Sequence, residues 1–270
     1  MGKKTTVARQ AKPIRVLNID EIALEKGHGN FVLVLSAPEA GYVLEVLPDR
    51  ERKTLENWLE RLAPEMKKAI KVVNMDMWEP YTLAVKAKLP HARIVVDRFH
   101  VMKNLNHCLT MARREIQRNA SNEVKEHLKG SRWVLVKNQK DLNEKQRTKL
   151  ESLYQASPEL KVCHQLKEQF RTIFETVTDR QKARTALRCW IKQVEKLNVT
   201  ALQSFLVTLK NWFELILNYF VERWTNAFAE GINNKIKLIK RRAFGFTNFD
   251  HFRLRSWSSV PPTPLNPKEP

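Results

Sequence analysis

Cysteine is scarce in this sequence, and the few cysteines present are poorly placed for cross-linking. Cys108, Cys163 and Cys189 are odd in number and include no CxxC pair. They can build neither a disulfide framework nor a cysteine-rich zinc module. We therefore expect a protein of a reducing compartment such as the cytoplasm.

Long apolar runs are missing as well. No segment approaches the roughly 20 consecutive apolar residues that a helix needs to cross a bilayer. The basic start, MGKKTTVARQAKP, also lacks the apolar core of a signal peptide. We therefore expect neither a membrane-spanning nor a secreted protein.

Acidic residues are the third shortage. Asp and Glu total 29 against 48 Lys and Arg, which gives a formal net charge of +19 at pH 7. This excess is larger than solubility requires, so it predicts a polyanionic partner, nucleic acid first and an anionic membrane surface second. With 270 residues, the chain can form one large domain or one domain with a large insertion.

Apolar segments in the first hundred residues predict a mixed β-sheet. The first three predicted strands are 14–20, 31–35 and 42–47. A helix at 52–62 follows, and then come two more strands, 72–75 and 94–96, with a short helix at 80–89 between them. Short connections make the first three strands an antiparallel meander. The whole order is that of a ribonuclease H-like core, in which parallel strands extend such a meander.

Each of three predicted strands carries an aspartate near its end: Asp20, Asp76 and Asp97. The carboxyl ends of buried strands are where an open α/β sheet usually binds ligands. A single such aspartate is equally well explained as a cap of the next helix, but two in one strand–helix–strand unit favour a site. Asn18 and Asn74 share the faces of Asp20 and Asp76, and polar residues in apolar runs are costly unless paired or metal-bound.

Residues from about 104 to 220 have almost no strand alternation, and helical spacing dominates there. One predicted helix carries the apolar residues from Leu105 to Ile116, and a second begins after Asp141 or Asn143. Three more cover 158–177, 179–197 and 202–220. The apolar run at 133–136 is also compatible with a short strand. Because so long a connection cannot be a structureless loop, we predict a large all-helical insertion before the last catalytic helix.

The last periodic segment predicts a helix with one apolar and one polar face. Phe228, Ile232, Ile236 and Ile239 form the apolar face, Asn226, Glu230, Asn233, Lys237 and Arg241 form the polar face, and Gly245 ends the helix. The predicted α/β chain therefore consists of a disordered basic leader (1–12), the first part of the core (13–103), the insertion (104–220), the core helix (221–255) and a disordered proline-rich tail (256–270).

Four acidic residues are candidate metal ligands: Asp20, Asp76, Asp97 and Glu230. Two-metal phosphoryl chemistry needs carboxylates that hold Mg²⁺ or Mn²⁺ ions roughly 3.5–4 Å apart. Glu230 is the best third ligand because its helix continues into a basic stripe suited to a phosphodiester, made of Lys235, Lys237, Lys240, Arg241 and Arg242. Taken alone, the helix is better explained as a solvated face on which Glu230 pairs with Lys237 or Asn234. The three aspartates of the strands reverse this preference and favour Glu230 as a ligand.

His100 follows Asp97 by three residues, at the start of the next predicted helix. It can orient a carboxylate or a phosphate, and it can equally be a plain capping residue. The sequence leaves both interpretations open.

Four segments resemble signature blocks of bacterial insertion-sequence transposases of the ISL-three type, a DDE family with a ribonuclease H-like catalytic domain. The blocks are NIDEIALEKGHG, VVNMDMWEPY, VVDRFHVMKN and FAEGINNKIKLIKRRAFGF, within residues 14–255. The resemblance implies divalent-metal-dependent cleavage and strand transfer, with transposon ends and target DNA as partners. It also implies a nucleoid-associated protein of the bacterial cytoplasm, and it allows a homo-oligomer on DNA.

By position, the resemblance assigns the family's acidic triad to Asp20, Asp76 and Glu230. Asp97 and His100 match the D-x-x-H motif that follows the second aspartate in related families. Strand order favours Asp76 over Asp97 as the essential second carboxylate, although both stay candidates.

The chain departs from the family at its ends. A cysteine-rich zinc-binding region and a helix-turn-helix segment are not visible, and the sequence beyond Arg255 differs from the usual continuation. We therefore expect a catalytic-domain fragment or a truncated gene copy that binds DNA with little regard to sequence. Two rival functions are a ribonuclease H-like nuclease without strand transfer and an inactive DNA-binding remnant.

Overall fold

The computed structural model describes residues 13–24, 31–224, 227–243 and 248–258, with the side chains of 227–230 and 258 also outside the description. The expected leader (1–12), the turn at Gly27 and Gly29, the helix end at Gly245 and residues 259–270 of the expected tail therefore lie outside the described residues. The chain divides into two compact units. We call residues up to Asp97 together with those from Trp224 the core unit, and Arg98–Arg223 the helical unit.

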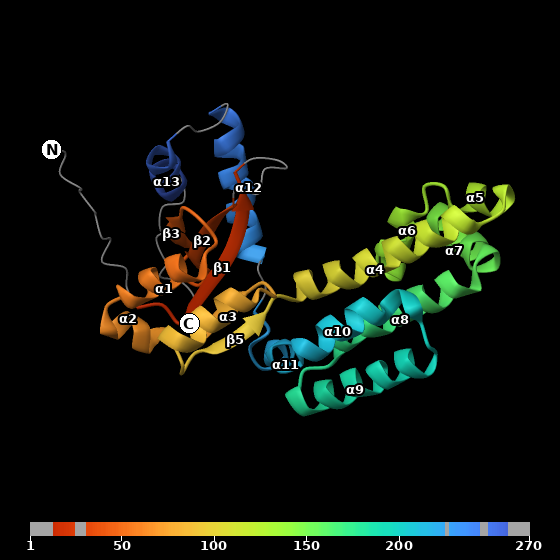
Figure 1. Ribbon diagram of the computed structural model, residues 1–270, viewed down its shortest axis with the longest axis horizontal. Helices are drawn as coiled ribbons and strands as arrows, with labels where there is room; N and C mark the ends of the chain where they lie inside the picture. The colour runs from red at the N-terminus through yellow and green to blue at the C-terminus, as the bar shows by residue number, and fades with distance from the viewer. Residues whose placement is uncertain (1–12, 25–30, 225–226, 244–247, 259–270) are drawn as a thin grey trace. The chain divides into compact units, whose positions relative to one another are not determined.

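Within the described residues of the core unit, five strands form one mixed sheet: β1 (Val16–Ala23), β2 (Phe31–Ala37), β3 (Tyr42–Leu47), β4 (Val72–Met75) and β5 (Arg93–Val96). Their order is β3-β2-β1-β4-β5 (Figure 1). β1 pairs with β2, and β2 with β3, in antiparallel fashion, whereas β4 pairs in parallel with both β1 and β5. The antiparallel meander extended by parallel strands, as predicted from the sequence, is confirmed.

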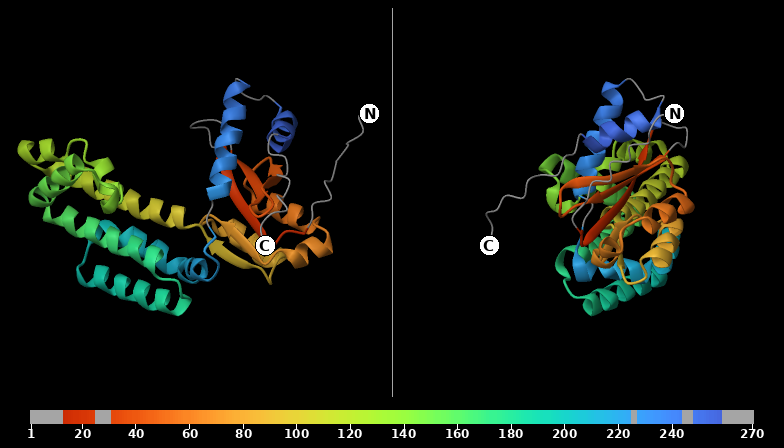
Figure 2. Two further views of the ribbon diagram at one scale, coloured as in Figure 1. Left: turned by 180° about the vertical axis from the view of Figure 1, so that it is seen from behind. Right: turned by 90° about the vertical axis from the view of Figure 1, so that its left-hand side faces the viewer.

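Helices pack on both faces of this sheet: α1 (Arg52–Glu60), α2 (Pro64–Ala69), α3 (Glu79–Lys88), α12 (Ala227–Arg242) and α13 (Phe249–Ser258). Figures 1 and 2 show α12 alongside β1. Ile232 and Ile236 of α12 and Phe252 of α13 pack against Ile22 and Val34 of the sheet, so these helices cover the face to which Asp20 also projects.

The end of the core unit differs from the expected tail. Helix α13 continues to Ser258, three residues into the segment that we expected to be disordered from residue 256. Phe252 is fully buried, and Trp257 packs against the same apolar cluster. Burial of these aromatic rings stabilises a helix that has no regular amphipathic spacing, which is why the sequence pattern did not predict it.

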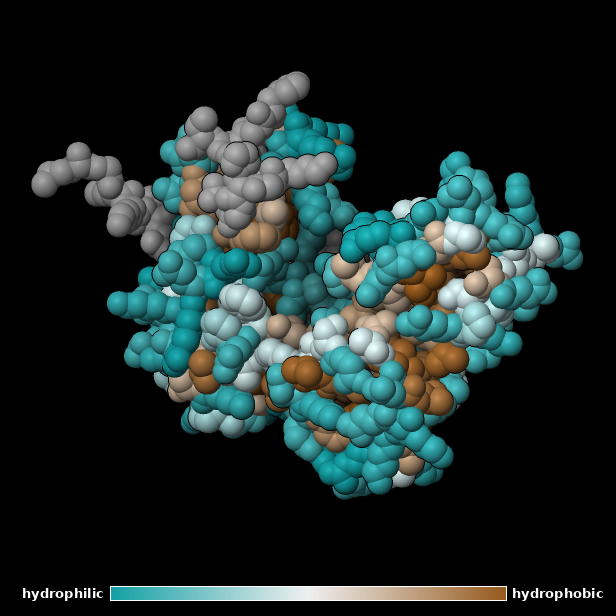
Figure 3. All heavy atoms as spheres, turned by 45° about the vertical axis from the view of Figure 1, so that its right-hand side comes forward, coloured by the Kyte–Doolittle hydropathy of each residue, from teal (hydrophilic) through white to brown (hydrophobic). Residues whose placement is uncertain are grey.

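The helical unit contains α4 (Arg98–Asn119), α5 (Asn122–Leu128), α6 (Arg132–Val136), α7 (Glu144–Ala156), α8 (Pro158–Thr176), α9 (Arg180–Lys196), α10 (Gln203–Asn211) and α11 (Phe213–Glu222), with short 3₁₀ turns at Gln139–Asp141 and Thr200–Leu202. Its core is aromatic, with the Phe170 ring packed on Phe174, Trp190 and Phe205. Hydrophilic residues cover most of the face seen in Figure 3, and the visible hydrophobic side chains gather mainly over this unit.

The structure decides one open point for this unit and corrects one expectation. The run at 133–136 lies in α6 and is not a strand, because an apolar run of four residues cannot separate a strand from a buried helix turn. The segment 202–220 forms two helices that meet at Trp212, whose backbone is not helical. Buried Leu209 and Ile216 lie seven residues apart, a spacing that fits one continuous helix and therefore conceals the break.

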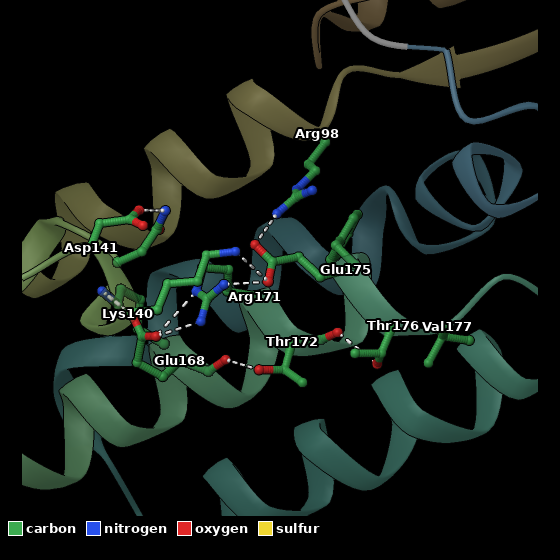
Figure 4. A network of polar contacts seen from close by, with 12 residues as sticks. Arg98, Lys140, Asp141, Glu168, Arg171, Thr172, Glu175, Thr176 and Val177 are labelled. Atoms are coloured by element: carbon green, nitrogen blue, oxygen red, sulfur yellow. Dashed lines mark hydrogen bonds and ion pairs between the residues drawn. The ribbon is translucent and has the colours of Figure 1, made fainter.

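A chain of ion pairs links α8 to its neighbours (Figure 4). Lys167, only 1% exposed, donates to the carbonyl oxygens of Leu135 and Lys137 at 3.0 and 2.9 Å and pairs with Glu168 at 2.6 Å. Arg171 joins Glu168 to Glu175, which also pairs with Arg98 and Lys140. Each of these charged side chains therefore has an ion-pair partner within the unit.

The helices of the described segments are too short or too polar to cross a membrane.

Candidate metal centre

The register of the parallel strands brings three aspartates to one level of the sheet. Ile19 lies beside Met75, and Met75 beside Val96, so the next step along each strand aligns Asp20, Asp76 and Asp97. Side chains at one level of parallel strands point to the same face. Asp76 and Asp97 directly follow β4 and β5, whereas β1 continues past Asp20 to Ala23, so the expectation that Asp20 ends its strand was wrong.

Both carboxylate oxygens of Asp20 accept a hydrogen bond. The backbone N–H of Glu21 donates to Oδ1 at 2.7 Å, and the Nδ2 amide of Asn233 donates to Oδ2 at 2.7 Å. These two bonds orient the carboxylate, whose oxygens are ligands of the kind that divalent cations bind. Asn233 comes from α12, which therefore fixes this side chain from outside the sheet.

Asp20, Asp76 and His100 form a cluster with the chemistry of a metal site. Each offers one ligand atom, and these atoms all lie within 4.8 Å of one another. His100 lies in the first turn of α4, and the chain itself holds it three residues beyond Asp97. Carboxylate oxygens are the ligands that suit Mg²⁺ and Mn²⁺, and imidazole extends the set towards transition metals.

A second level of polar residues lies one step further into the sheet. Asn18 of β1 pairs with Ser36 of β2 on one side and Asn74 of β4 on the other, and these three side chains are at most 1% exposed. Among the described residues, both amide atoms of Asn18, the hydroxyl of Ser36 and Oδ1 of Asn233 have no hydrogen-bond partner. Buried polar atoms without partners lower the stability of the fold. An ion that bound nearby with its water shell would provide the hydrogen-bond partners that this layer lacks.

Two other acidic candidates have different surroundings. Asp97 is 2% exposed, and its backbone N–H donates to Met75 O at 3.2 Å. Glu230 belongs to α12, but its side chain lies outside the described residues, so its place in the site stays a prediction. Asn233 follows Glu230 by three residues, a spacing that puts both on one side of a helix.

The acid next to Asp20 belongs to the other face. Glu21 accepts a hydrogen bond from the Tyr81 hydroxyl at 2.6 Å and pairs with Arg50 at 3.5 Å. Burial and this bond to Glu21 raise the pKa of Tyr81 well above its usual range. Glu21 therefore contributes to packing against α3 and not to the carboxylate cluster.

The basic stripe on α12 is not uniform. Lys235, Lys237, Arg241 and Arg242 are exposed, whereas Lys240 is half-buried and donates from Nζ to the carbonyl oxygen of Ala23 at 3.0 Å. Lys240 thus connects the last turn of α12 to the end of β1. We grouped these cations as one stripe from the sequence, because helical spacing does not show which of them reach the sheet.

Comparison with known proteins identifies the family of this chain. A sequence model of the family described as Transposase, the ISL-three group of DDE transposases, matches residues 17–256. The chain belongs to this transposase family. It is 33% identical over 251 residues to the "Transposase for insertion sequence element IS1001" of Bordetella parapertussis, covering 92% of this chain and 61% of the relative.

Two further relatives come from strains of Mycobacterium tuberculosis. Each is named "Transposase for insertion sequence element IS1557" and is 25% identical over 256 residues, covering 86% of this chain and 57% of the relative. The chain therefore spans about three-fifths of the length of these curated transposases. DDE transposases generally use a divalent metal, and Asp20, Asp76 and His100 fit that requirement by the chemistry of their ligand atoms.

Proposed function

We propose that this chain is the catalytic part of a DNA transposase that cuts transposon ends and joins them to target DNA. The reaction is two-metal phosphoryl transfer with Mg²⁺ or Mn²⁺. The observation that carries the proposal is the approach of Asp20 and Asp76 from neighbouring strands, with ligand atoms within 4.8 Å of each other and of His100. Family membership supports DNA as the substrate class.

The proposal includes a ribonuclease H-like fold for the core unit. Its support is the strand order β3-β2-β1-β4-β5, with an antiparallel meander continued by two parallel strands. We also propose that residues 104–220 are an insertion between the two parts of this core. The chain leaves the core unit at Asp97 and returns at Trp224, which is consistent with that division.

Asp20, Asp76 and Glu230 are the proposed metal ligands, with Asp97 and His100 in auxiliary roles. When bound, the divalent metals would activate the attacking oxygen and stabilise the leaving oxygen of the phosphodiester. Asp20 and Asp76 hold hard oxygen ligands at one level of a rigid sheet. Support for Glu230 is indirect, since Asn233, on the same side of α12, reaches Asp20.

DNA phosphates are the proposed partners of the α12 stripe, made of Lys235, Lys237, Lys240, Arg241 and Arg242. Four of these side chains are exposed, and binding them to phosphates releases counterions. A homo-oligomer on the DNA and action at the nucleoid in the bacterial cytoplasm belong to the same proposal. The net charge of +19 supports a polyanionic partner.

Nicking of a supercoiled plasmid in the presence of Mn²⁺ tests the proposal. We expect the wild-type chain to nick and Asp76→Asn to lose more than about 100-fold of the rate, since a metal ligand matters at least as much as the groups that orient it. Asp141→Asn, which changes an exposed aspartate of the helical unit, should nick like the wild type. Nicks without joined products would favour the hydrolytic nuclease, and the absence of metal-dependent nicking would favour the inactive remnant.

A further inference from the structure

Asn233 stands out among the residues of α12 because it is polar, buried and directed to an acidic group. It is 5% exposed, although α12 is basic and its neighbours Asn234 and Lys235 are exposed. Its amide donates to Asp20 Oδ2 at 2.7 Å, and among the described residues its Oδ1 has no hydrogen-bond partner. One half of the amide is therefore used and the other is not.

The unused half lies close to the carboxylate. Amide nitrogen and oxygen are bonded to one carbon, so Oδ1 of Asn233 is no more than about 5 Å from Asp20 Oδ2. A carboxylate accepts hydrogen bonds and offers no donor in return. Oδ1 needs a donor, and a water bound to a cation at Asp20 is a donor of suitable chemistry at that distance.

We propose that Asn233 is a positioning residue of the metal centre: its N–H orients Asp20 for the metal, and its Oδ1 accepts from metal-bound water. This inference rests on the proposed function, because it requires a divalent metal at Asp20. A purely structural hydrogen bond that links α12 to β1 would explain the contact made by the N–H group but not the buried Oδ1. It would leave Oδ1 buried and unsatisfied, which is costly.

Calorimetric titration with Mn²⁺, without any DNA or activity, separates the two roles. Asn233→Leu keeps the size of the side chain and removes both polar atoms, so the Kd for Mn²⁺ should rise about 10-fold or more, as for other groups that orient metal ligands. The matched control is Asn234→Leu, an exposed asparagine on the same helix, whose Kd should equal that of the wild type.

Thermal unfolding of Asn233→Asp provides a second readout that does not depend on the first variant folding. A carboxylate beside Asp20 repels it without metal and adds a ligand with metal. The Tm in EDTA should therefore fall, and the rise in Tm on adding Mn²⁺ should exceed that of the wild type. Asn234→Asp should show the wild-type rise.

The outcomes distinguish the inference from the function on which it rests. If the wild type binds Mn²⁺ and Asn233→Leu binds it equally well, or if Asn233→Asp gains no more from Mn²⁺ than the wild type, Asn233 is only a structural tie. If the wild type itself shows no binding of Mn²⁺, the metal centre of the proposed function is wrong.

Discussion

The two units of this protein both bury polar side chains, but they satisfy them in different ways. In the helical unit, Lys167 has two carbonyl oxygens and Glu168 as partners, and Arg171 has Glu168 and Glu175. In the core unit, polar atoms of Asn18, Ser36 and Asn233 have no partner among the described residues. The charged groups of the first set are paired with one another, whereas the second set contains buried polar atoms that have no partner among the described residues.

This difference separates stability from function. A buried charge that is paired and hydrogen-bonded contributes to a defined packing, and removing one partner is expensive because the other is left alone. Buried polar atoms without partners reduce stability, and the proposed metal centre would give those near Asp20 a role in binding. Substitutions of the paired charges should therefore mainly lower the stability of the fold, whereas substitutions in the second set should mainly change metal binding.

The largest effect on folding is expected at Lys167. Replacing it with methionine keeps an unbranched side chain of similar length but removes the donor to two carbonyl oxygens and one of the two cations paired with Glu168. Urea unfolding should show a loss of about 3–5 kcal/mol. Exposed Lys161→Met on the same helix is the control and should change stability by less than about 0.5 kcal/mol. An equally small loss for Lys167→Met would show that the buried pairs are not stabilising.

A smaller, pH-dependent effect is expected at His164, which is fully buried beside the Tyr154 hydroxyl. Burial lowers the pKa of His164 to about 4, from an unfolded value of 6.5. Between these values the unfolded chain binds more protons, so stability falls as the pH falls, by about 3 kcal/mol in total. Denaturation at pH 7 and pH 4.5 should show that His164→Leu has lost this part of the acid sensitivity. Exposed His107→Leu should keep it, and equal pH slopes in the two variants would contradict the assignment.

The smallest effect concerns two lysines of α12. Lys237→Ala should weaken binding to all DNAs alike and lower the salt slope of log K by about one, because it removes one phosphate contact. Lys240→Ala should change the slope less, since Nζ of Lys240 donates to Ala23 O. DNA titrations at several salt concentrations check both variants. Equal slopes for them would mean that Lys240 leaves the sheet to bind phosphate.

Local patterns in the sequence predicted most of the fold because they reflect local forces. Apolar runs located the strands, and helical spacing located the helices of residues 104–220, including α7 behind its Asn143 cap. The extension of β1 past Asp20 was missed because two acidic residues interrupt its apolar pattern. Helix α13 was missed because its stability comes from contacts of Phe252 with distant residues.

The candidate site was predictable in composition but not in arrangement. Asp20, Asp76, Asp97 and Glu230 could be named from charge and position, and Asn18 and Asn74 from their parity. The common level of the three aspartates depends on strand register, which is a non-local property. Asn233 was expected on a polar face, but helical spacing does not show that this face turns an amide onto Asp20.

Anomalous scattering from crystals soaked in Mn²⁺ would show whether Asp20 and Asp76 hold divalent metal. We expect Mn²⁺ peaks bound by oxygens of both aspartates at roughly 2.1 Å, with two ions about 3.5–4 Å apart when DNA is present. In an Asp76→Asn crystal these peaks should weaken or disappear. Mn²⁺ bound elsewhere, with none at Asp20 and Asp76, would mean that these aspartates are not metal ligands.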